Sequence, residues 1–318
     1  MQTSETRAGL TIQPLEGANF GASVSGLKPR EITDEQRKVL WDVYGERHGL
    51  ICFEFDYMIE EDELHAITAV FGEKEFSPGL INGIGKRAAP GEEHLTVEEQ
   101  EAQVRATGRD PYMAYIGNLD WRTLERKPVE DNFYGEWEWH TDMSYIPQPP
   151  TFSLLHSRVI PPEGGDTAFC SQVMAAKEMP AEMREKVRGK TAKHDSTYGS
   201  SGQLRPGMTV PASPLEAEGY CHPIIRIVPT TGDEAVFLGR RTNNYIDGLP
   251  LEESEKLLDE IWAHSTQEKY CYRHKWKLGQ VVVWDNRMML HFRHPVPSDQ
   301  NRFMWRTQTK GEAVIAAD

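Results

Sequence analysis

The sequence of 318 residues predicts a mainly β protein with flanking helices, built as a sandwich or a jelly-roll barrel. Two observations carry this prediction. Many short apolar runs are separated by turn-forming residues, and the few helical stretches do not alternate regularly with them as they would in a βαβ protein. No internal repeat or Gly/Ser linker divides the chain, so we expect one domain over residues 1–318, with flexible tails at 1–10 and 312–318.

The first third of the chain is expected to hold two helices around a buried strand. Thr33 and Gln36 have the spacing of a capping box, and apolar residues follow at helical intervals. Residues 50–55 (LICFEF) are typical of a buried strand, and the next helix is expected to end at Gly72. Residues 73–110 are polar, acidic and punctuated by Gly and Pro, which predicts a long surface excursion or lid.

Most of the predicted strands lie in the remaining two thirds. Two helices are expected among them, at 181–187 and 251–264, and the second has one apolar side. The predicted strands cover residues 112–119, 151–160, 167–170, 220–228, 235–238, 280–284 and 303–307.

Composition and charge make several classes of function unfavourable. A net charge of −14 makes nucleic acid an unfavourable partner, because the surface repels phosphate. The sequence has no run of ~20 apolar residues and no basic start followed by an apolar stretch, so we expect no membrane association and a cytoplasmic location. The four cysteines lie far apart without a C-x-x-C pair, and we expect them to be reduced packing residues. They are Cys52, Cys170, Cys221 and Cys271.

Three residues have the side chains of a metal site. In an extended segment, His140 and Asp142 would project to the same side and could share one metal. His291 follows a predicted buried strand and turn. Each residue alone has an ordinary explanation, a chance His-x-Asp pair or a core histidine. Together they form a two-histidine, one-carboxylate set, which leaves open coordination positions and suits non-haem iron(II) oxygenases.

Two arginines follow on a predicted strand. Residues four apart on a strand face the same way, so Arg302 and Arg306 would both point to the side of Met304, which we expect to be the barrel interior. Buried guanidinium groups need anionic partners, and a dicarboxylate cosubstrate supplies one. The alternative is a pair of surface arginines on an edge strand.

At this point the residues carry a family resemblance. The order W-H-T-D, E-G-G-D-T, W-D-N-R…H and then two arginines closely resembles the taurine/2,4-dichlorophenoxyacetate dioxygenase (TauD/TfdA) family. The spacing of 11 residues from His291 to Arg302 also matches that family, and so does the opening of the chain from Pro14 to Gly26.

The resemblance implies a double-stranded β-helix (jelly roll) that uses Fe(II), O₂ and 2-oxoglutarate, with His140, Asp142 and His291 on the metal. It implies that Arg302 and Thr167 bind the distal carboxylate of 2-oxoglutarate, and that Arg306 meets an anionic group of the small-molecule substrate. Thr167 could instead be only a β-branched residue that opens a strand. Family members commonly associate, so a homo-oligomer is expected.

The sequence also departs from the taurine-binding members. Glu136 stands where those members have another polar residue, and a glutamate would repel a sulfonate. Arg240, Arg241 and Asn244 are expected to have surface or structural roles. Two other functions stay open: a zinc hydrolase with the same three ligands, and a non-catalytic barrel that serves as a binding module.

Overall fold

The computed structural model describes residues 4–76, 96–127, 138–199, 202–205 and 207–317. Its main element is an eight-stranded sheet in the order β1-β2-β3-β4-β14-β6-β16-β5. The pairings are antiparallel except between β3 and β4, which run parallel. The strands are β1 (Glu5–Arg7), β2 (Leu10–Pro14), β3 (Ala22–Ser25), β4 (Leu50–Glu54), β14 (Val281–Asp285), β6 (Phe152–Val159), β16 (Phe303–Gln308) and β5 (Ala114–Gly117).

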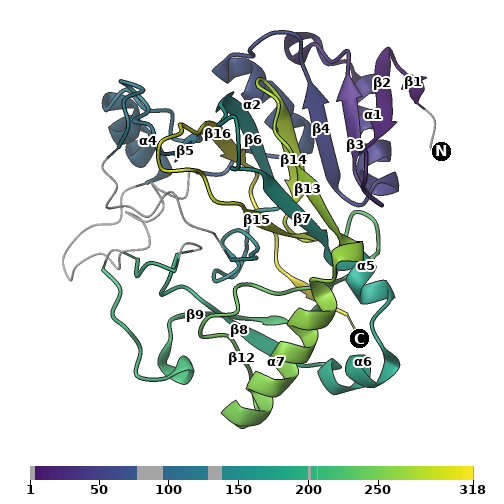
Figure 1. Ribbon diagram of the computed structural model, residues 1–318, viewed down its shortest axis with the longest axis vertical. Coiled ribbons are helices and arrows are strands. Elements are labelled where there is room, and N and C mark those ends of the chain that lie inside the picture. Colours follow the sequence, from purple (N-terminus) through teal and green to yellow (C-terminus); the bar gives the residue numbers. More distant parts are fainter. Residues whose placement is uncertain (1–3, 77–95, 128–137, 200–201, 206, 318) are drawn as a thin grey trace.

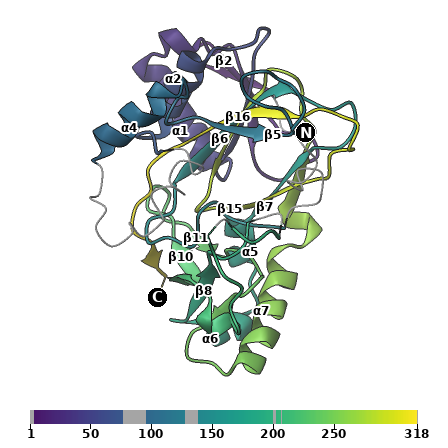
Figure 2. The same cartoon turned by 90° about the vertical axis from the view of Figure 1, so that its left-hand side faces the viewer.

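The described residues also form three smaller sheets, and Figure 2 shows β7 and β15 between β16 and β5 of the large sheet and the strands β8, β10 and β11 of the other two. The first has the order β13-β7-β15, with β13 (Cys271–His274), β7 (Thr167–Ser171) and β15 (Met289–Arg293). The second has β12 (Tyr245–Ile246), β8 (Thr191–Asp195) and β9 (Gly219–Pro223), and the third has β11 (Glu234–Val236), β10 (Ile225–Ile227) and β17 (Ile315–Ala316).

Helices flank these sheets at both ends of the molecule (Figures 1 and 2). Beside the large sheet are α1 (Asp34–Glu46), α2 (Glu61–Phe71) and α4 (Val97–Ala106), and at the other end are α5 (Gln172–Lys177), α6 (Ala181–Val187) and α7 (Leu251–Ser265). The described residues also include the short 3₁₀ helices η1 (Pro29–Glu31), η3 (Pro214–Glu216) and η4 (Glu268–Tyr270). In the described part of the chain no helix is long and apolar enough to cross a bilayer.

The helices α1 and α2 cover one face of the large sheet. The ring of Phe152 on β6 packs against Trp41 of α1 at 5.7 Å and Phe71 of α2 at 5.2 Å. The capping box that the sequence predicts at Thr33 does begin α1. Because side chains alternate along a strand, Ser153, the neighbour of Phe152, points to the opposite face. That face is left for the functional site.

Both ends of the chain form more regular structure than expected. Residues 1–10 were expected to be flexible; residues 1–3 lie outside the described residues, but β1 pairs with β2 and Leu10 is fully buried. At the other end β17 pairs with β10, and Glu312 forms an ion pair with the buried Arg287. Backbone pairing and burial of apolar side chains hold the described parts of these segments, and residue 318 lies outside the described residues.

The expected surface excursion at 73–110 is partly structured. Lys74 bridges to Thr309, and the buried Phe76 stacks on Tyr112 with ring centroids 5.2 Å apart. Helix α4 forms where no helix was expected, and a capping box between Thr96 and Glu99 begins it. Residues 77–95 of this segment lie outside the described residues.

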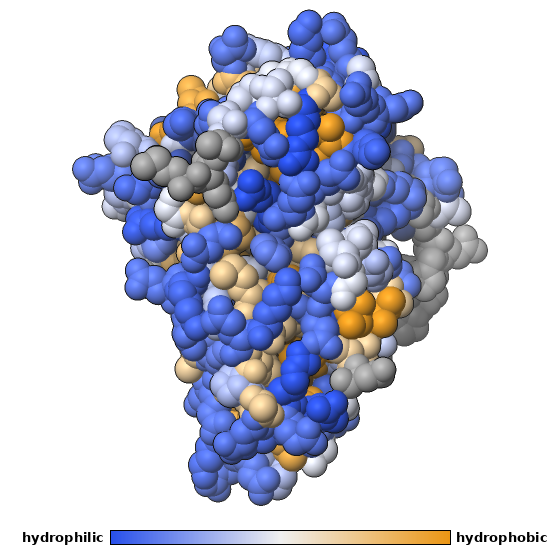
Figure 3. Space-filling model, turned by 90° about the vertical axis from the view of Figure 1, so that its right-hand side faces the viewer, coloured by the Kyte–Doolittle hydropathy of each residue, from blue (hydrophilic) through white to orange (hydrophobic). Residues whose placement is uncertain are grey.

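The outer surface is largely hydrophilic on the face shown in Figure 3, where apolar residues form only small separate patches. This agrees with the high charge of the sequence, in which 49 acidic residues outnumber 35 basic ones.

Candidate metal centre

The two histidines of the predicted set are backbone neighbours. His291 lies in the middle of β15, and an isolated bridge joins it to His140 through hydrogen bonds of 3.0 and 2.9 Å in both directions. The rings are therefore close, with centroids 4.0 Å apart. The expected extended run from His140 to Asp142 holds only at His140, because the chain turns at Asp142 and Met143 has a φ of +48°.

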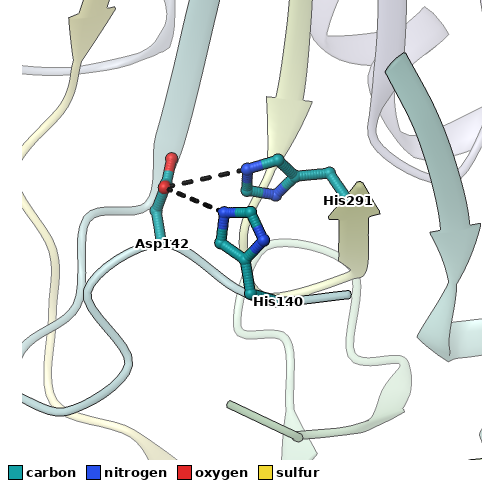
Figure 4. A group of neighbouring side chains, drawn as sticks. All are labelled: His140, Asp142 and His291. Atoms are coloured by element: carbon teal, nitrogen blue, oxygen red, sulfur yellow. Dashed lines mark ion pairs between the residues drawn. The ribbon is translucent and has the colours of Figure 1, made fainter. Parts of the chain in front are cut away.

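The turn brings Asp142 to the histidines. Its Oδ1 lies 3.7 Å from Nε2 of His291 and 3.9 Å from Nε2 of His140 (Figure 4). One ligand atom from each of the three residues lies within 4.8 Å of the others, and all three are buried. Two imidazoles and one carboxylate converging in this way can hold a metal on one side and leave other coordination positions open.

The protonation of the histidines suits a metal. Nδ1 of His140 donates to the carbonyl of Glu138 at 2.8 Å, which leaves Nε2 with its lone pair toward Asp142. Burial lowers the pKa of His291 to about 4. Burial, His291 and Arg240 together hold the pKa of His140 well below its usual range. Both rings are therefore neutral at pH 7, which is the form that binds metals.

Asp142 is held as an anion with a fixed orientation. Its Oδ2 accepts hydrogen bonds from Oγ of Ser153 at 2.7 Å and from Nε2 of Gln308 at 3.1 Å. Its Oδ1 lies 3.4 Å from Nη1 of Arg306. Burial opposes ionisation, but Arg306, the histidines and Ser153 outweigh it, so the pKa of Asp142 lies well below its usual range. Sequence reasoning missed Ser153 and Gln308, which come from the adjacent strands β6 and β16.

Arg302 is enclosed just before β16. It is 1% exposed, its backbone N–H donates to Oδ1 of Asn118, and its Nε donates to the carbonyl of Gly165 at 3.1 Å. Two glycines permit this enclosure. A Cβ at Gly117 would lie 1.9 Å from the carbonyl oxygen of Arg302, and a Cβ at Gly165, where φ is +67°, would lie 3.1 Å from its Cδ.

The charge of Arg302 has no counter-ion in the described part of the chain. No carboxylate there lies within ion-pair distance, and Nη1 has no hydrogen-bond partner. Burial lowers the pKa of Arg302, and the charge of Arg293 lowers it further. Burying a guanidinium without a counter-ion destabilises the folded protein. Two of its N–H groups can donate to the two oxygens of one carboxylate. The residues present therefore fit a carboxylate ligand here.

Thr167 begins β7 on the same face as the metal ligands. It pairs with Arg293 in the β7–β15 ladder, two residues along from the pair Phe169 and His291. That separation is about 7 Å along the strand. Its Oγ1 accepts a hydrogen bond from Nε1 of Trp276 at 3.1 Å, a residue that sequence reasoning did not single out.

The pair Arg302 and Arg306 does not lie on one regular strand. Arg302 precedes β16, and the register between β16 and β6 shifts at Phe303 and Met304. The two side chains reach different surroundings: Arg302 contacts Gly165, whereas Arg306 contacts Asp142.

Arg240 and Arg241 differ in burial. Arg241 lies at the surface with Glu255 and Asp259, as expected. Arg240 is only 8% exposed; Nη1 donates to the carbonyl of Tyr198, and Nε has no partner in the described part of the chain. Of the two roles expected for Arg240 and Asn244, surface or structural, burial excludes the surface one for both residues, and Asn244 is fully buried.

The loop of Arg240 packs beside the metal ligands. Gly239 lies so close to Oγ of Ser144 that a Cβ would come within 2.7 Å, and Thr242 donates to the carboxylate of Glu138. The positive charge of Arg240 accordingly lowers the pKa of both metal-site histidines. Glu136 and Trp137 lie outside the described residues.

A buried two-histidine, one-carboxylate set is typical of non-haem iron enzymes, and Arg302, a buried arginine that has no ion-pair partner among the described residues, fits an acidic cosubstrate. Residues 11–308 match the taurine catabolism dioxygenase TauD, TfdA family, and the chain belongs to this family. It is therefore an Fe(II)- and 2-oxoglutarate-dependent dioxygenase.

Curated relatives support this assignment. The chain is 31% identical over 209 residues to the alpha-ketoglutarate-dependent 2,4-dichlorophenoxyacetate dioxygenase of Cupriavidus pinatubonensis, covering 64% of this chain and 71% of that one. It is 26% identical over 309 residues to the (S)-phenoxypropionate/alpha-ketoglutarate-dioxygenase of Sphingobium herbicidovorans, covering 95% of each.

Solved structures share the fold. The structure of AAD-2 in complex with Mn(II) and N-oxalylglycine has a TM-score of 0.70 at 23% identity, covering 98% of this chain and 100% of that one. A taurine dioxygenase from Burkholderia xenovorans has a TM-score of 0.69 at 24% identity, with 98% and 94% coverage.

Proposed function

We propose that the protein hydroxylates a small, anionic organic substrate, with succinate and CO₂ as co-products. The observation that carries this proposal is the buried set of His140, Asp142 and His291 together with Arg302, a buried arginine that has no ion-pair partner in the described residues. His140, Asp142 and His291 hold the iron, and Arg302 and Thr167 bind the distal carboxylate of 2-oxoglutarate. We also infer that the sheets form a double-stranded β-helix within a single catalytic domain.

Each residue of the proposed site has its own role. Bound iron supplies the activation of O₂ that is coupled to oxidative decarboxylation of 2-oxoglutarate. Ser153 and Gln308 hold Asp142 in one orientation, so the carboxylate stays directed at the histidines. Trp284 packs against His291 with ring centroids 4.9 Å apart and excludes water from that side of the imidazole. Arg302 orients the cosubstrate through its guanidinium fork.

Both the relatives and the structure support an anionic substrate. The relatives include a 2,4-dichlorophenoxyacetate dioxygenase, a phenoxypropionate dioxygenase and an alpha-ketoglutarate-dependent sulfate ester dioxygenase of Pseudomonas putida. The last is 30% identical over 191 residues, which cover 57% of this chain and 62% of that one. In the structure, Arg306 lies beside the metal ligands. Arg240 is buried near them without an acidic partner in the described residues, and a buried guanidinium favours an anion nearby.

A zinc hydrolase with the same ligands is a weaker candidate. It would give the enclosed charge of Arg302 no role, although Gly117 makes room for the backbone of Arg302 and Gly165 for its side chain. A non-catalytic binding module would leave the same charge unexplained.

The experiment is an anaerobic titration with iron(II) and 2-oxoglutarate, followed by visible absorption. Chelation of the metal by the oxo-acid gives a weak charge-transfer band, which His140→Ala, Asp142→Ala and His291→Ala should abolish. The same protein under air should then form succinate with members of a panel of carboxylates, sulfonates and sulfate esters. A wild-type protein without the band and without iron affinity would refute the proposal, and a preference for neutral substrates would refute its substrate class.

A further inference from the structure

Two of the four cysteines face each other across a pair of strands. Cys170 on β7 and Cys271 on β13 are directly opposite in the antiparallel register, and their Sγ atoms lie 3.0 Å apart. Opposite residues in such a ladder have Cα atoms about 4.5–5.5 Å apart, which falls inside the range that disulfides span. The thiols can therefore be joined without moving the backbone, although both are free in this structure.

We propose that Cys170 and Cys271 are a redox-sensitive pair that a hydroperoxide oxidises to a reversible disulfide. The sequence offered no sign of it, because 101 positions separate the two residues. The other two cysteines have different surroundings: Cys52 is buried on β4, and Cys221 on β9 lies opposite Lys193.

The surroundings distinguish the two sulfurs. Cys271 is partly exposed, whereas Cys170 is fully buried. The hydrogen bond between the thiols lowers the pKa of Cys271, and the same contact together with burial raises the pKa of Cys170. Cys271 is therefore the thiol that a peroxide reaches and the one that ionises first.

The chemistry balances with a hydroperoxide as oxidant. The Cys271 thiolate attacks the peroxide, the O–O bond breaks, and Cys271 becomes a sulfenic acid while water or an alcohol leaves. The sulfur of Cys170 then attacks the Cys271 sulfur; the S–O bond breaks, and the proton of Cys170 leaves with the hydroxide as water. Two thiols lose two electrons, which the peroxide takes up. A thiol reductant reverses the step.

The carbonyl of Ser265 tolerates the loss of its S–H donor. Sγ of Cys170 donates to the carbonyl of Ser265 at the end of α7, at 3.1 Å. Nε2 of Gln172 donates to the same carbonyl at 3.2 Å, so this oxygen keeps a partner after oxidation. Formation of the disulfide leaves no new buried acceptor unsatisfied at this position.

The bond would fasten an edge strand beside the proposed cosubstrate site. In its sheet, β13 pairs only with β7. The chain continues from β13 to Trp276, which donates to Thr167 at the start of β7.

The test uses the full-length protein, reduced and freed of metal by a chelator so that iron does not oxidise it. With about one equivalent of hydrogen peroxide, wild type and Cys221→Ser should each lose two thiols and regain them with dithiothreitol. Cys271→Ser should not lose two thiols together, because Cys170 then has no partner for a disulfide. Peptide mapping without reduction should find a link between Cys170 and Cys271, and the oxidised protein should melt on the order of 5 °C higher, because a long loop has been closed.

Cys170→Ala removes the other cysteine of the pair, so a folding defect in Cys271→Ser alone cannot decide the result. This variant should retain a reactive Cys271 but form no intramolecular disulfide. Intact thiols at both positions after peroxide treatment would overturn the proposal. So would irreversible oxidation of Cys271 in the wild type, or a disulfide that involves Cys52 or Cys221 instead.

Discussion

The guanidinium of Arg306 lies 3.4 Å from Oδ1 of Asp142, the same oxygen that faces both histidines. The proposed substrate arginine and the proposed metal carboxylate are thus in contact, and a single substitution affects both. A substrate anion at Arg306 would lie directly beside the metal, which suits a reaction at a carbon close to the anionic group.

The first prediction concerns Arg306. Arg306→Ala should raise the KM of an anionic substrate about 10–100-fold, because a partly buried charge partner is removed. The affinity for 2-oxoglutarate at saturating iron should change little, and Arg306→Lys should restore part of the substrate affinity. The matched control is Arg158→Ala on the neighbouring strand, whose guanidinium lies 3.9 Å from the Trp305 ring. A variant impaired only in 2-oxoglutarate binding would place Arg306 in the cosubstrate site.

The second prediction concerns the donors to Asp142. Ser153→Ala and Gln308→Leu each remove one hydrogen bond to Oδ2 and should weaken metal binding about tenfold. Calorimetric titration with Mn(II) measures this without turnover. Thr307→Val, next to Gln308 but bonded to Thr68 on the opposite face, should bind the metal like wild type. Equal affinities in all four proteins would show that the two donors do not position the carboxylate.

Sequence reasoning named the three residues that the structure brings together, because their type and order carry the chemistry. It missed Ser153, Gln308 and Trp276, since a serine, a glutamine or a tryptophan on a strand has no distinctive local pattern. Gln308 lies 166 positions from Asp142, and only the pairing of β6 with β16 brings it there.

The same limit applies to the fold. Long apolar runs such as β6 and β14 were predicted within a residue or two of their observed bounds. Strand β15, which carries His291, was not predicted because its short run follows closely on another strand. Arg240 was expected to resemble its neighbour Arg241, and only tertiary packing buries one and exposes the other.

The third prediction concerns Arg302. Arg302→Ala should weaken 2-oxoglutarate binding by on the order of 2–5 kcal/mol, because the carboxylate loses its charged partner. The charge-transfer absorption should then require far higher concentrations of 2-oxoglutarate, while iron affinity stays close to wild type. Arg184→Ala, which removes a surface ion pair with Glu234, is the control. An unchanged 2-oxoglutarate affinity in a folded Arg302→Ala protein would move the cosubstrate carboxylate elsewhere.

The fourth prediction compares Arg240 with Arg241. Arg240→Gln should raise the KM of an anionic substrate at least about tenfold, because it removes a buried positive charge near the metal ligands. Arg241→Gln removes a charge from the surface, where ion pairs contribute little, and should leave KM unchanged. Equal kinetics in the two variants would make Arg240 a packing residue that holds Tyr198.

The fifth prediction is a pH dependence of stability that arises from a histidine outside the metal site. His156 is fully buried; its Nδ1 bonds to the carbonyl of Gln280 at 3.2 Å, and Nε2 has no partner in the described part of the chain. Burial lowers the pKa of His156 to about 4, compared with about 6.5 in the unfolded chain. Above pH 6.5 the ring is neutral in both states, so its contribution to stability is fully present.

As the pH falls below 6.5, the unfolded chain takes up a proton that the folded protein does not, and the free energy of unfolding falls until about pH 4. The loss from His156 amounts to at most about 3 kcal/mol. Urea unfolding of metal-free wild type and His156→Gln at pH 7 and pH 4.5 measures it. The other buried histidines titrate in both proteins and cancel in the difference, so the variant should lose less stability than wild type. Equal losses would show that His156 is not protonated on unfolding.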